Sequence, residues 1–383
     1  MEPLKILHII TGLNRGGAET VMVRLILHMN HRRFKPVVVS LMDEGAYGAD
    51  LRIAGVPLYT LGMKRGRPTM WGLLRLLKIL RKERPRMVQT WLYHADFAGL
   101  LIAPFLRGVP LVWNLRCSAM DMTQYSPQMR RTRRILARFS GVPSAVIVNS
   151  EAGRIFHESI GYRPRRWEEI PNGFDTEFFR PSEERRSQWR QRLGIGDKAS
   201  LVGMVARVDP MKDYATFFAA AVRIAEARPD TAFLLVGLDT EKLAIPSSLA
   251  GKVHALGESK NVEQILPALD LLLLSSAFGE GFPNVVGEAM ACGVPAVATS
   301  VGDTASLIAG TGSVVAPRDS GAMAAAALAI LGRDPAARAQ HGEAARKRIL
   351  DRYGLKLMVE HYERVYGAIA EGPTARARRI MKA

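Results

Sequence analysis

Apolar runs of strand length alternate with longer amphipathic stretches along the first half of the chain. The apolar runs are 4–10, 36–41, 87–91, 111–114 and 145–149. The stretches with a helical period are 18–30, 70–84, 94–106 and 127–139. Continuous apolar strands that alternate with helices are typical of a parallel sheet covered by helices on both faces. The first half of the pattern therefore predicts an α/β domain.

The same alternation starts again in the second half. Apolar runs lie at 200–206, 231–237, 252–256, 270–275 and 294–298. Helical stretches lie at 213–228, 261–268, 284–291 and 321–331. A chain of 383 residues is too long for one ordinary core. We therefore predict two doubly wound, Rossmann-like α/β domains that face each other across a cleft.

A turn-rich segment, 170–181, separates the two patterns, and its Asn172–Gly173 pair is a strong turn signal. The predicted division has a first domain, a second domain, and a C-terminal helix with a basic tail. We expect that helix and tail to pack back on the first domain. The predicted boundaries are 1–178, 179–354 and 355–383.

The two cysteines, Cys117 and Cys292, lie far apart in the sequence. They argue against a disulfide framework and for a reducing compartment. The first residues carry no signal-peptide pattern, and no apolar run approaches the roughly 18 residues of a membrane span. We therefore expect a cytoplasmic protein that is soluble or lies on the inner face of the cytoplasmic membrane.

The net charge of +17 is unevenly distributed along the chain. Residues 1–180 hold 28 Lys and Arg against 14 Asp and Glu, a balance of +14, whereas residues 181–383 hold 25 against 22, a balance of +3. A basic half can face nucleic acid, anionic lipid or a phosphorylated substrate. Ordinary solubility of a basic protein is the alternative explanation.

Two glycines, Gly16 and Gly17, follow the first apolar run and precede an amphipathic stretch. Ligands of doubly wound sheets bind beyond the carboxyl ends of the strands, so residues just after each run are candidate site residues. Glycine lets backbone N–H groups approach a ligand, and a helix start favours anions. A tight strand-to-helix turn explains the same two glycines, so both interpretations stay open.

Two cations follow the apolar run 200–206. Arg207 and Lys212 lie on either side of Pro210 in the segment VARVDPMKD, and both are expected at the edge of the second sheet. Arginine offers a planar fork and lysine a point charge, and the two together suit a diphosphate. Solvated surface cations are the alternative.

The mostly apolar stretch FGEGFPNVVGEAMACG carries two acids, Glu280 and Glu288. Pro283 is expected at the first position of a helix, so Glu280 precedes the helix and Glu288 lies one turn inside it. A carboxylate accepts two hydrogen bonds, and vicinal hydroxyls are paired donors. Glu280 can then hold sugar hydroxyls and Glu288 ribose hydroxyls, with the helix start facing a diphosphate. A capping acid explains Glu280 alone.

These segments resemble the retaining GT-B glycosyltransferases of family 4 over nearly the whole length. The matching segments are GLNRGGAE, NSE, IPNGFD, ARVDPMKD and FGEGFPNVVGEAMACGVPAVAT. The resemblance implies that Glu280 contacts the donor sugar, that Glu288 contacts the ribose, and that Arg207 and Lys212 bind the diphosphate. It also implies an acceptor-side first domain and a donor-binding second domain. Backbone groups expected at the donor belong to Gly281, Phe282, Pro283 and Asn284.

The resemblance extends to the first domain. Gly16 and Gly17 resemble the family loop that closes over donor phosphate or acceptor. His94 matches a family histidine near the transferred sugar, although a lone histidine is as often structural. Glu280 and His94 are therefore the candidate catalytic residues. The segment 113–121, WNLRCSAMD, departs from the histidine-containing family pattern, so it is expected only to line a cleft wall and leaves acceptor recognition open.

The sequence contains no Asp-x-Asp pair, so we expect no metal and no other cofactor, with the diphosphate neutralised by Arg207, Lys212 and the helix start. The expected reaction moves a hexosyl group from a UDP- or GDP-sugar to a hydroxyl of a glycan or lipid-linked acceptor in cell-surface polysaccharide or glycolipid synthesis. Retention of configuration is implied by the family. A nucleotide-sugar epimerase or a phosphorylase on the same fold is the alternative.

Two basic segments, 63–86 and 128–141, raise the question of a surface partner. The first carries a leucine-rich helical stripe and Trp71 among its basic residues. A basic amphipathic helix can lie on an anionic membrane, but a helix packed on the sheet with a solvated basic face has the same pattern. A nucleic-acid partner is not expected, because aromatic residues make up only 7% of the chain and the basic runs are mixed with leucine.

Overall fold

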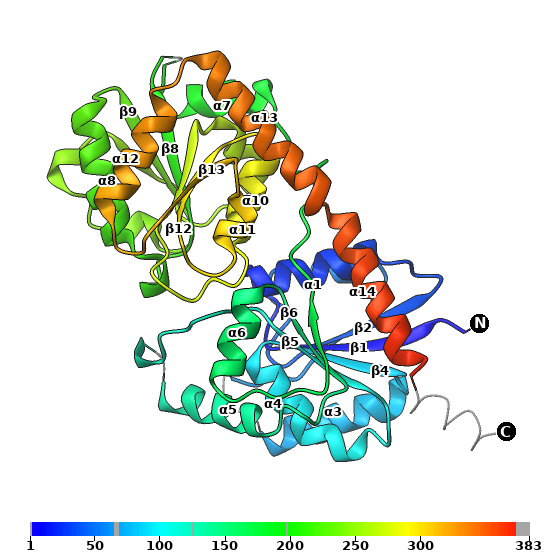
Figure 1. Cartoon of the computed structure of the whole chain (residues 1–383). Helices are drawn as coiled ribbons and strands as arrows, with labels where there is room; N and C mark the ends of the chain where they lie inside the picture. The colour runs from blue at the N-terminus through cyan, green and yellow to red at the C-terminus, as the bar shows by residue number, and fades with distance from the viewer. Residues whose placement is uncertain (1, 65–68, 125, 197, 373–383) are drawn as a thin grey trace. The chain divides into compact units, whose positions relative to one another are not determined.

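The computed structural model describes residues 2–64, 69–124, 126–196 and 198–372. They form two compact units. Unit 1 combines the residues up to Gly173 with those from Leu355 onward, and unit 2 runs from Phe174 to Gly354 (Figure 1). Both units are α/β domains with a parallel sheet, so the predicted fold class is confirmed.

Unit 1 contains a seven-stranded parallel sheet in the order β3-β2-β1-β4-β5-β6-β7. Its strands are β1 (Leu4–Ile10), β2 (Phe34–Ser40), β3 (Leu58–Thr60), β4 (Met87–Trp91), β5 (Leu111–Leu115), β6 (Ala145–Val148) and β7 (Trp167–Glu169). Its α-helices are α1 (Gly17–His28), α2 (Gly48–Ile53), α3 (Met70–Glu83), α4 (Tyr93–Ile102), α5 (Pro127–Arg138), α6 (Glu151–Ser159) and α14 (Leu355–Ala370).

The helices of unit 1 cover both faces of its sheet, as Figure 1 shows. Successive strand residues point to opposite faces. In β1, Ile6 and Ile10 therefore share one core with α1, α2 and α14, whereas Leu7 and Ile9 share the other core with α3, α4 and α5. The run LKILHII is apolar on both faces for this reason.

Unit 2 contains a six-stranded parallel sheet in the order β10-β9-β8-β11-β12-β13. Its strands are β8 (Ser200–Val205), β9 (Thr231–Val236), β10 (Val253–Ala255), β11 (Leu271–Leu274), β12 (Ala296–Thr299) and β13 (Gly312–Val315). Its α-helices are α7 (Glu183–Arg192), α8 (Tyr214–Ala227), α9 (Val262–Ile265), α10 (Asn284–Ala291), α11 (Thr304–Ile308), α12 (Ser320–Leu331) and α13 (Pro335–Arg352).

The units divide after Gly173, five residues before the boundary at 178 that the sequence predicts. Phe174 already belongs to the second unit, because its fully buried ring stacks on Phe282 at 6.2 Å between centroids. The chain returns to unit 1 at Leu355, and α14 buries one side in the unit 1 core. The basic tail, 373–383, lies outside the described residues.

A histidine lies inside the unit 1 core. His8, on the central strand β1, is fully buried, and its Nδ1 accepts a 3.3 Å hydrogen bond from Trp91 Nε1. The proton of the neutral ring therefore belongs on Nε2. Burial disfavours the charged form and lowers the pKa of His8 to about 3.

We expect the free energy of unfolding of unit 1 to fall as the pH drops below 6.5, the ordinary pKa of His8. Above that pH the ring is neutral in both the folded and the unfolded state, so it contributes nothing to the pH dependence of the free energy of unfolding. Below it, the unfolded chain binds a proton that the buried ring does not, which costs about 1.4 kcal/mol per pH unit. Urea titrations should show a shallower decline for His8→Gln, and equal slopes would contradict the expectation.

Candidate active site

The predicted residues of unit 2 follow the two central strands of its sheet. From β8 the chain proceeds outward to β9 and β10, and from β11 it proceeds the other way to β12 and β13. The strand order therefore reverses between β8 and β11, which are paired. Ligands of doubly wound sheets bind beyond the carboxyl ends of the strands at such a switch point. Arg207 and Lys212 follow β8, and Glu280 follows β11.

The loop after β8 is held rigidly at its backbone. Ser275 Oγ, at the end of β11, donates to the carbonyl oxygens of Lys212 at 2.8 Å and Asp213 at 3.0 Å. Asp213 has a positive φ of 48° and caps α8 by accepting from the Thr216 amide at 3.1 Å. These contacts support the backbone at Lys212, from which its flexible side chain extends.

Lys212 and Glu280 are in direct contact at this edge of the sheet. The Lys212 ammonium forms an ion pair with Glu280 Oε1, and the same oxygen accepts a 2.7 Å hydrogen bond from Ser276 Oγ. Both side chains are largely buried. The sequence predicts that these two residues contact different parts of a ligand, and the structure brings them together.

Arg207 differs from Lys212 in its exposure. Its side chain is 52% exposed and pairs with Asp209 at 3.0 Å. Asp209 also accepts from the Met211 amide at 3.0 Å, which orients the turn that carries Lys212. An exposed ion pair of this kind contributes little to stability, so the guanidinium can turn to another anion at small cost.

A glycine outside the predicted site residues lies against the loop of Glu280. Gly302 has a φ of +61°, and a Cβ there would lie 2.2 Å from the Glu280 carbonyl oxygen and 2.4 Å from that of Gly281. The next residue, Asp303, donates its amide to Gly281 O at 2.9 Å. Only glycine fits this close approach. The sequence does contain a signal for this glycine, because it lies in the segment SVGD, just after the apolar run 294–298.

Helix α10 spans Asn284–Ala291, the predicted helical stretch, but Pro283 is not its first residue as expected. Pro283 is its extended N-cap residue, and Asn284 is its first residue, because the ψ of Pro283 is 107° and not helical. Phe282 is buried between Phe174 and Tyr353, so only its backbone is placed to meet a ligand. Glu288 lies half-buried, one turn inside the helix.

The predicted residues of unit 1 also lie at a switch point. The strand order reverses between β1 and β4, which are paired. Gly16, the N-cap of α1, and Gly17, its first residue, follow β1; His94, the second residue of α4, follows β4. Leu92, just before α4, has a φ of 72°. A left-handed backbone at a bulky residue is strained and clusters at functional sites.

Arg116 has a structural role that the sequence did not reveal. Its guanidinium donates to Tyr362 Oη at 3.2 Å and to Asn172 Oδ1, and it lies over the Trp91 ring at 5.6 Å. It therefore joins the end of β5 to α14 and to the segment that leaves unit 1. No local pattern could predict this contact, because Tyr362 lies 246 residues away.

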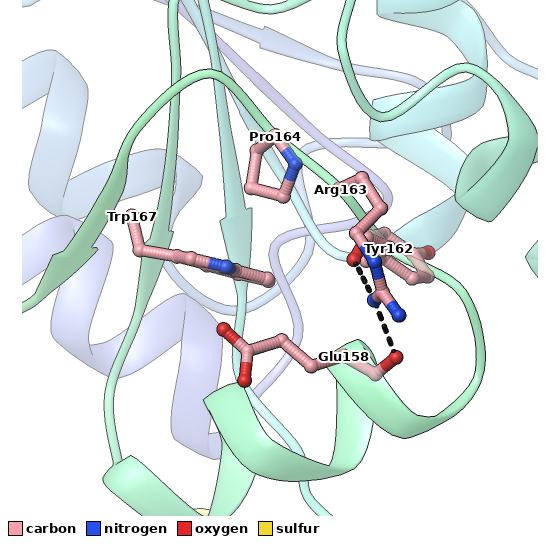
Figure 2. Close-up of a pocket in the computed structure, with 5 residues that line it drawn as sticks. All are labelled: Glu158, Tyr162, Arg163, Pro164 and Trp167. Carbon is pink, nitrogen blue, oxygen red and sulfur yellow. Dashed lines mark hydrogen bonds between the residues drawn. The ribbon is translucent and has the colours of Figure 1, made fainter.

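A surface pocket of about 360 Å³ lies elsewhere in unit 1. Figure 2 shows the Trp167 indole with Pro164 on one side and Glu158 on the other. Arg163 is held there by 2.7 Å bonds to the carbonyl oxygens of Glu158 and Tyr162. This loop leads into β7, so the pocket lies toward the amino ends of the strands, away from the edge of His94.

In the part of the chain that the structure describes, no three His, Cys, Asp or Glu side chains gather as metal ligands would. Metal independence itself stays a prediction. Cys117 and Cys292 are both unpaired. Across the same described ranges, no helix combines the length and apolar character of a membrane span.

Two doubly wound parallel sheets with switch-point sites define the GT-B class of fold. The crystal structure of Anabaena Alr3699/HepE in complex with UDP and glucose matches with a TM-score of 0.81 at 22% identity, covering 95% of this chain and 100% of that one. Residues 15–178 match the family described as Glycosyltransferase Family 4, and residues 199–333 match the one described as Glycosyl transferases group 1. The chain belongs to these family 4, group 1 glycosyltransferases.

Two relatives of the chain are also named as glycosyltransferases. The putative glycosyltransferase EpsF of Bacillus subtilis (strain 168) is 25% identical over 310 residues, which are 76% of this chain and 78% of that protein. The UDP-Gal:alpha-D-GlcNAc-diphosphoundecaprenol alpha-1,3-galactosyltransferase of Escherichia coli is 28% identical over 250 residues, 61% of this chain and 62% of that protein.

Proposed function

We propose that the protein is a retaining, metal-independent glycosyltransferase that moves a hexosyl group from a UDP- or GDP-sugar to a hydroxyl of a glycan or lipid-linked acceptor. The observation that carries the proposal is the buried pairing of Lys212 with Glu280 at the switch point of unit 2. A cation for phosphate and an acceptor for hydroxyls lie in direct contact there, beside the start of α10.

The diphosphate of the donor is assigned to Arg207, Lys212 and the first turn of α10. Arginine and lysine supply charge-assisted hydrogen bonds, and the free N–H groups of the helix start add a positive partial charge. These groups stabilise the leaving phosphate as negative charge develops on it. Glu288, one turn inside α10, is assigned to the ribose hydroxyls.

The transferred sugar is assigned to Glu280 of unit 2, and His94 of unit 1 is the second catalytic candidate. Glu280 acts by binding hydroxyls and not as a nucleophile. In the proposed step the bond between C1 and the phosphate oxygen breaks, and the phosphate leaves with the electron pair. The acceptor oxygen attacks C1 on the same face and gives its proton to the departing phosphate. Configuration is thereby retained, and water must be excluded as a competing acceptor.

The acceptor is assigned to the lipid-linked class. The name of the Escherichia coli relative gives a diphosphoundecaprenol-linked acceptor. A lipid-linked acceptor places the reaction at a membrane surface, and we propose the inner face of the cytoplasmic membrane, for cell-surface polysaccharide or glycolipid synthesis.

Calorimetry against a panel of UDP-, GDP-, ADP- and dTDP-sugars, followed by product analysis, tests this function. We expect one nucleotide to bind, and sugar transfer to require an added acceptor. Conversion of the nucleotide-sugar to an isomer without any acceptor would contradict transfer and indicate an epimerase.

Glu288→Ala is expected to weaken nucleoside diphosphate binding by about tenfold to a hundredfold, because each hydrogen bond to a charged group contributes roughly 1.5–3 kcal/mol. Calorimetry with the matching nucleoside diphosphate measures the loss. Glu184→Ala, on the exposed side of α7, is the matched control and should bind as the wild type does. Unchanged affinity of the Glu288 variant would remove that residue from the nucleotide site.

A further inference from the structure

The first turns of α3 expose a cluster of large apolar side chains. Met70 is 72% exposed, Trp71 78% and Leu74 50%. At about 3.6 residues per turn these three share one side of the helix, while Leu76 on the opposite side is fully buried in the unit 1 core. Exposed apolar side chains that are grouped in this way mark an interaction surface more often than isolated ones do.

The same side of α3 is basic beyond its apolar turns. Arg75, Lys78 and Arg81 are exposed, and within the described residues no acidic side chain forms an ion pair with any of them. Residues 61–140 hold 16 Lys and Arg against 3 Asp and Glu, so this segment contributes +13 of the chain's +17. The surface is therefore complementary to a dense negative charge with an apolar layer beside it.

The apolar turns lie at the edge of the sheet where the candidate residues of unit 1 lie. Helix α3 follows the parallel strand β3 and α4 follows β4, so both helices begin at the carboxyl ends of the strands. The two helices also pack against each other. Helix α3, which carries Met70 and Trp71, is therefore a direct neighbour of the helix that carries His94.

Helix α5 presents a different surface. Its exposed side chains include Arg130, Arg131, Arg134 and Arg138. Leu136 is buried and Ile135 half-buried, so α5 itself exposes charge without a large apolar side chain. The two basic segments, which look alike in the sequence, therefore differ: α3 groups three exposed apolar side chains with its basic ones, whereas segment 128–141 has one, Phe139 at 47%, just after the end of α5.

We propose that α3 docks unit 1 on an anionic lipid bilayer, with Met70, Trp71 and Leu74 inserted at the level of the headgroups and the basic side chains of α3 on the lipid phosphates. This proposal extends the proposed function, since it puts the acceptor-side edge of unit 1 at the surface that holds a lipid-linked acceptor. Amphipathic helices with Trp and Leu on one side and Lys and Arg on the other bind interfaces in this way. A nucleic acid would use the charge but not the inserted apolar turns.

Flotation with vesicles of phosphatidylcholine, with and without phosphatidylglycerol, tests the docking. The wild type is expected to float with the anionic vesicles, and to float less as salt is added, because salt screens exposed charges. Replacing Met70, Trp71 and Leu74 together by serine should lower the bound fraction by roughly tenfold. Ile53→Ser is the matched control, since Ile53 is 87% exposed on α2 and outside this surface.

A second variant tests the contribution of the basic side chains separately from that of the apolar turns. Arg75→Gln, Lys78→Gln and Arg81→Gln together should weaken flotation and flatten its dependence on salt, whereas Lys347→Gln on α13 should change neither. Equal flotation with neutral and anionic vesicles, or a serine variant that floats as the wild type does, would overturn the proposal. Tighter binding to duplex DNA than to vesicles would overturn it in favour of a nucleic acid.

Failure of the docking and failure of the proposed function are distinguishable. Calorimetry with the nucleotide-sugar panel, run on the same preparations, reports on unit 2 and does not require α3. Donor binding without flotation would reject only the membrane surface, and flotation without donor binding would reject only the proposed transferase.

Discussion

Replacing Glu280 by glutamine is expected to lower turnover by about a hundredfold to a thousandfold, the scale reported when one preorganised polar group at a reacting centre is removed. At the same time it should tighten the binding of free nucleoside diphosphate severalfold. The first effect follows from the loss of the carboxylate that accepts from the sugar hydroxyls. The second follows from the ion pair, because a diphosphate must compete with Glu280 for the ammonium of Lys212.

The two effects are measured separately, by steady-state turnover of the nucleotide-sugar and by calorimetry with the nucleoside diphosphate alone. Glu83→Gln is a matched control, because it removes a Lys–Glu pair, Lys5 with Glu83 at 3.2 Å, from unit 1. We expect it to leave both quantities unchanged. A glutamine variant of Glu280 that binds the diphosphate more weakly than the wild type would show that Lys212 and Glu280 do not compete.

Asp270→Ala is expected to destabilise unit 2 by about 3–5 kcal/mol, the cost of removing one partner from a buried ion pair. Asp270 accepts from Arg186 at 2.6 Å and from Arg190 at 3.1 Å, both on α7, and from the Leu201 amide at 2.7 Å. Arg190 is only 3% exposed, so the substitution leaves its charge buried without its carboxylate. The contact ties α7 to the central strands β8 and β11.

Urea unfolding measures this loss of stability, and hydrogen exchange assigns it to residues 174–354. Asp351→Ala serves as its control, because the pair of Lys347 and Asp351 is exposed, at 74% and 55% of the two side chains, and contributes little. If both variants unfold at the same urea concentration, the network around Asp270 does not stabilise the unit.

The predictable part of the fold was the part with fully buried strands. Central strands such as β1 and β11 are continuous apolar runs, so their sequence alone shows them. The edge strands β3 and β7 were missed because neither a long apolar run nor clear alternation marks them; β10, which is equally short and partly buried, was predicted from the run 252–256. Strand β13, which is four residues long and also only partly buried, and helices α2, α6 and α11 were not predicted either.

Site residues could be predicted where they directly follow a strand. They could not be predicted where their role depends on contacts between loops that follow different strands. Lys212 and Glu280 could be placed because the ends of parallel strands meet at one edge. Ser275 and Ser276 were missed as site residues, because their contacts depend on how the loops after β8 and β11 fold together. On α3, the leucines look alike in the sequence, but Leu74 is exposed whereas Leu73, Leu77 and Leu80 are half-buried.

The return of α14 to unit 1 has a consequence for biosynthesis. Leu355, Met358, Tyr362 and Tyr366 fill the core beneath β1 and β4, so that core cannot close while the ribosome is still translating unit 2. Domains generally fold as units in order of synthesis, N-terminal first. Here that order is inverted, because the half of the protein that emerges first is completed only once residue 370 has been made.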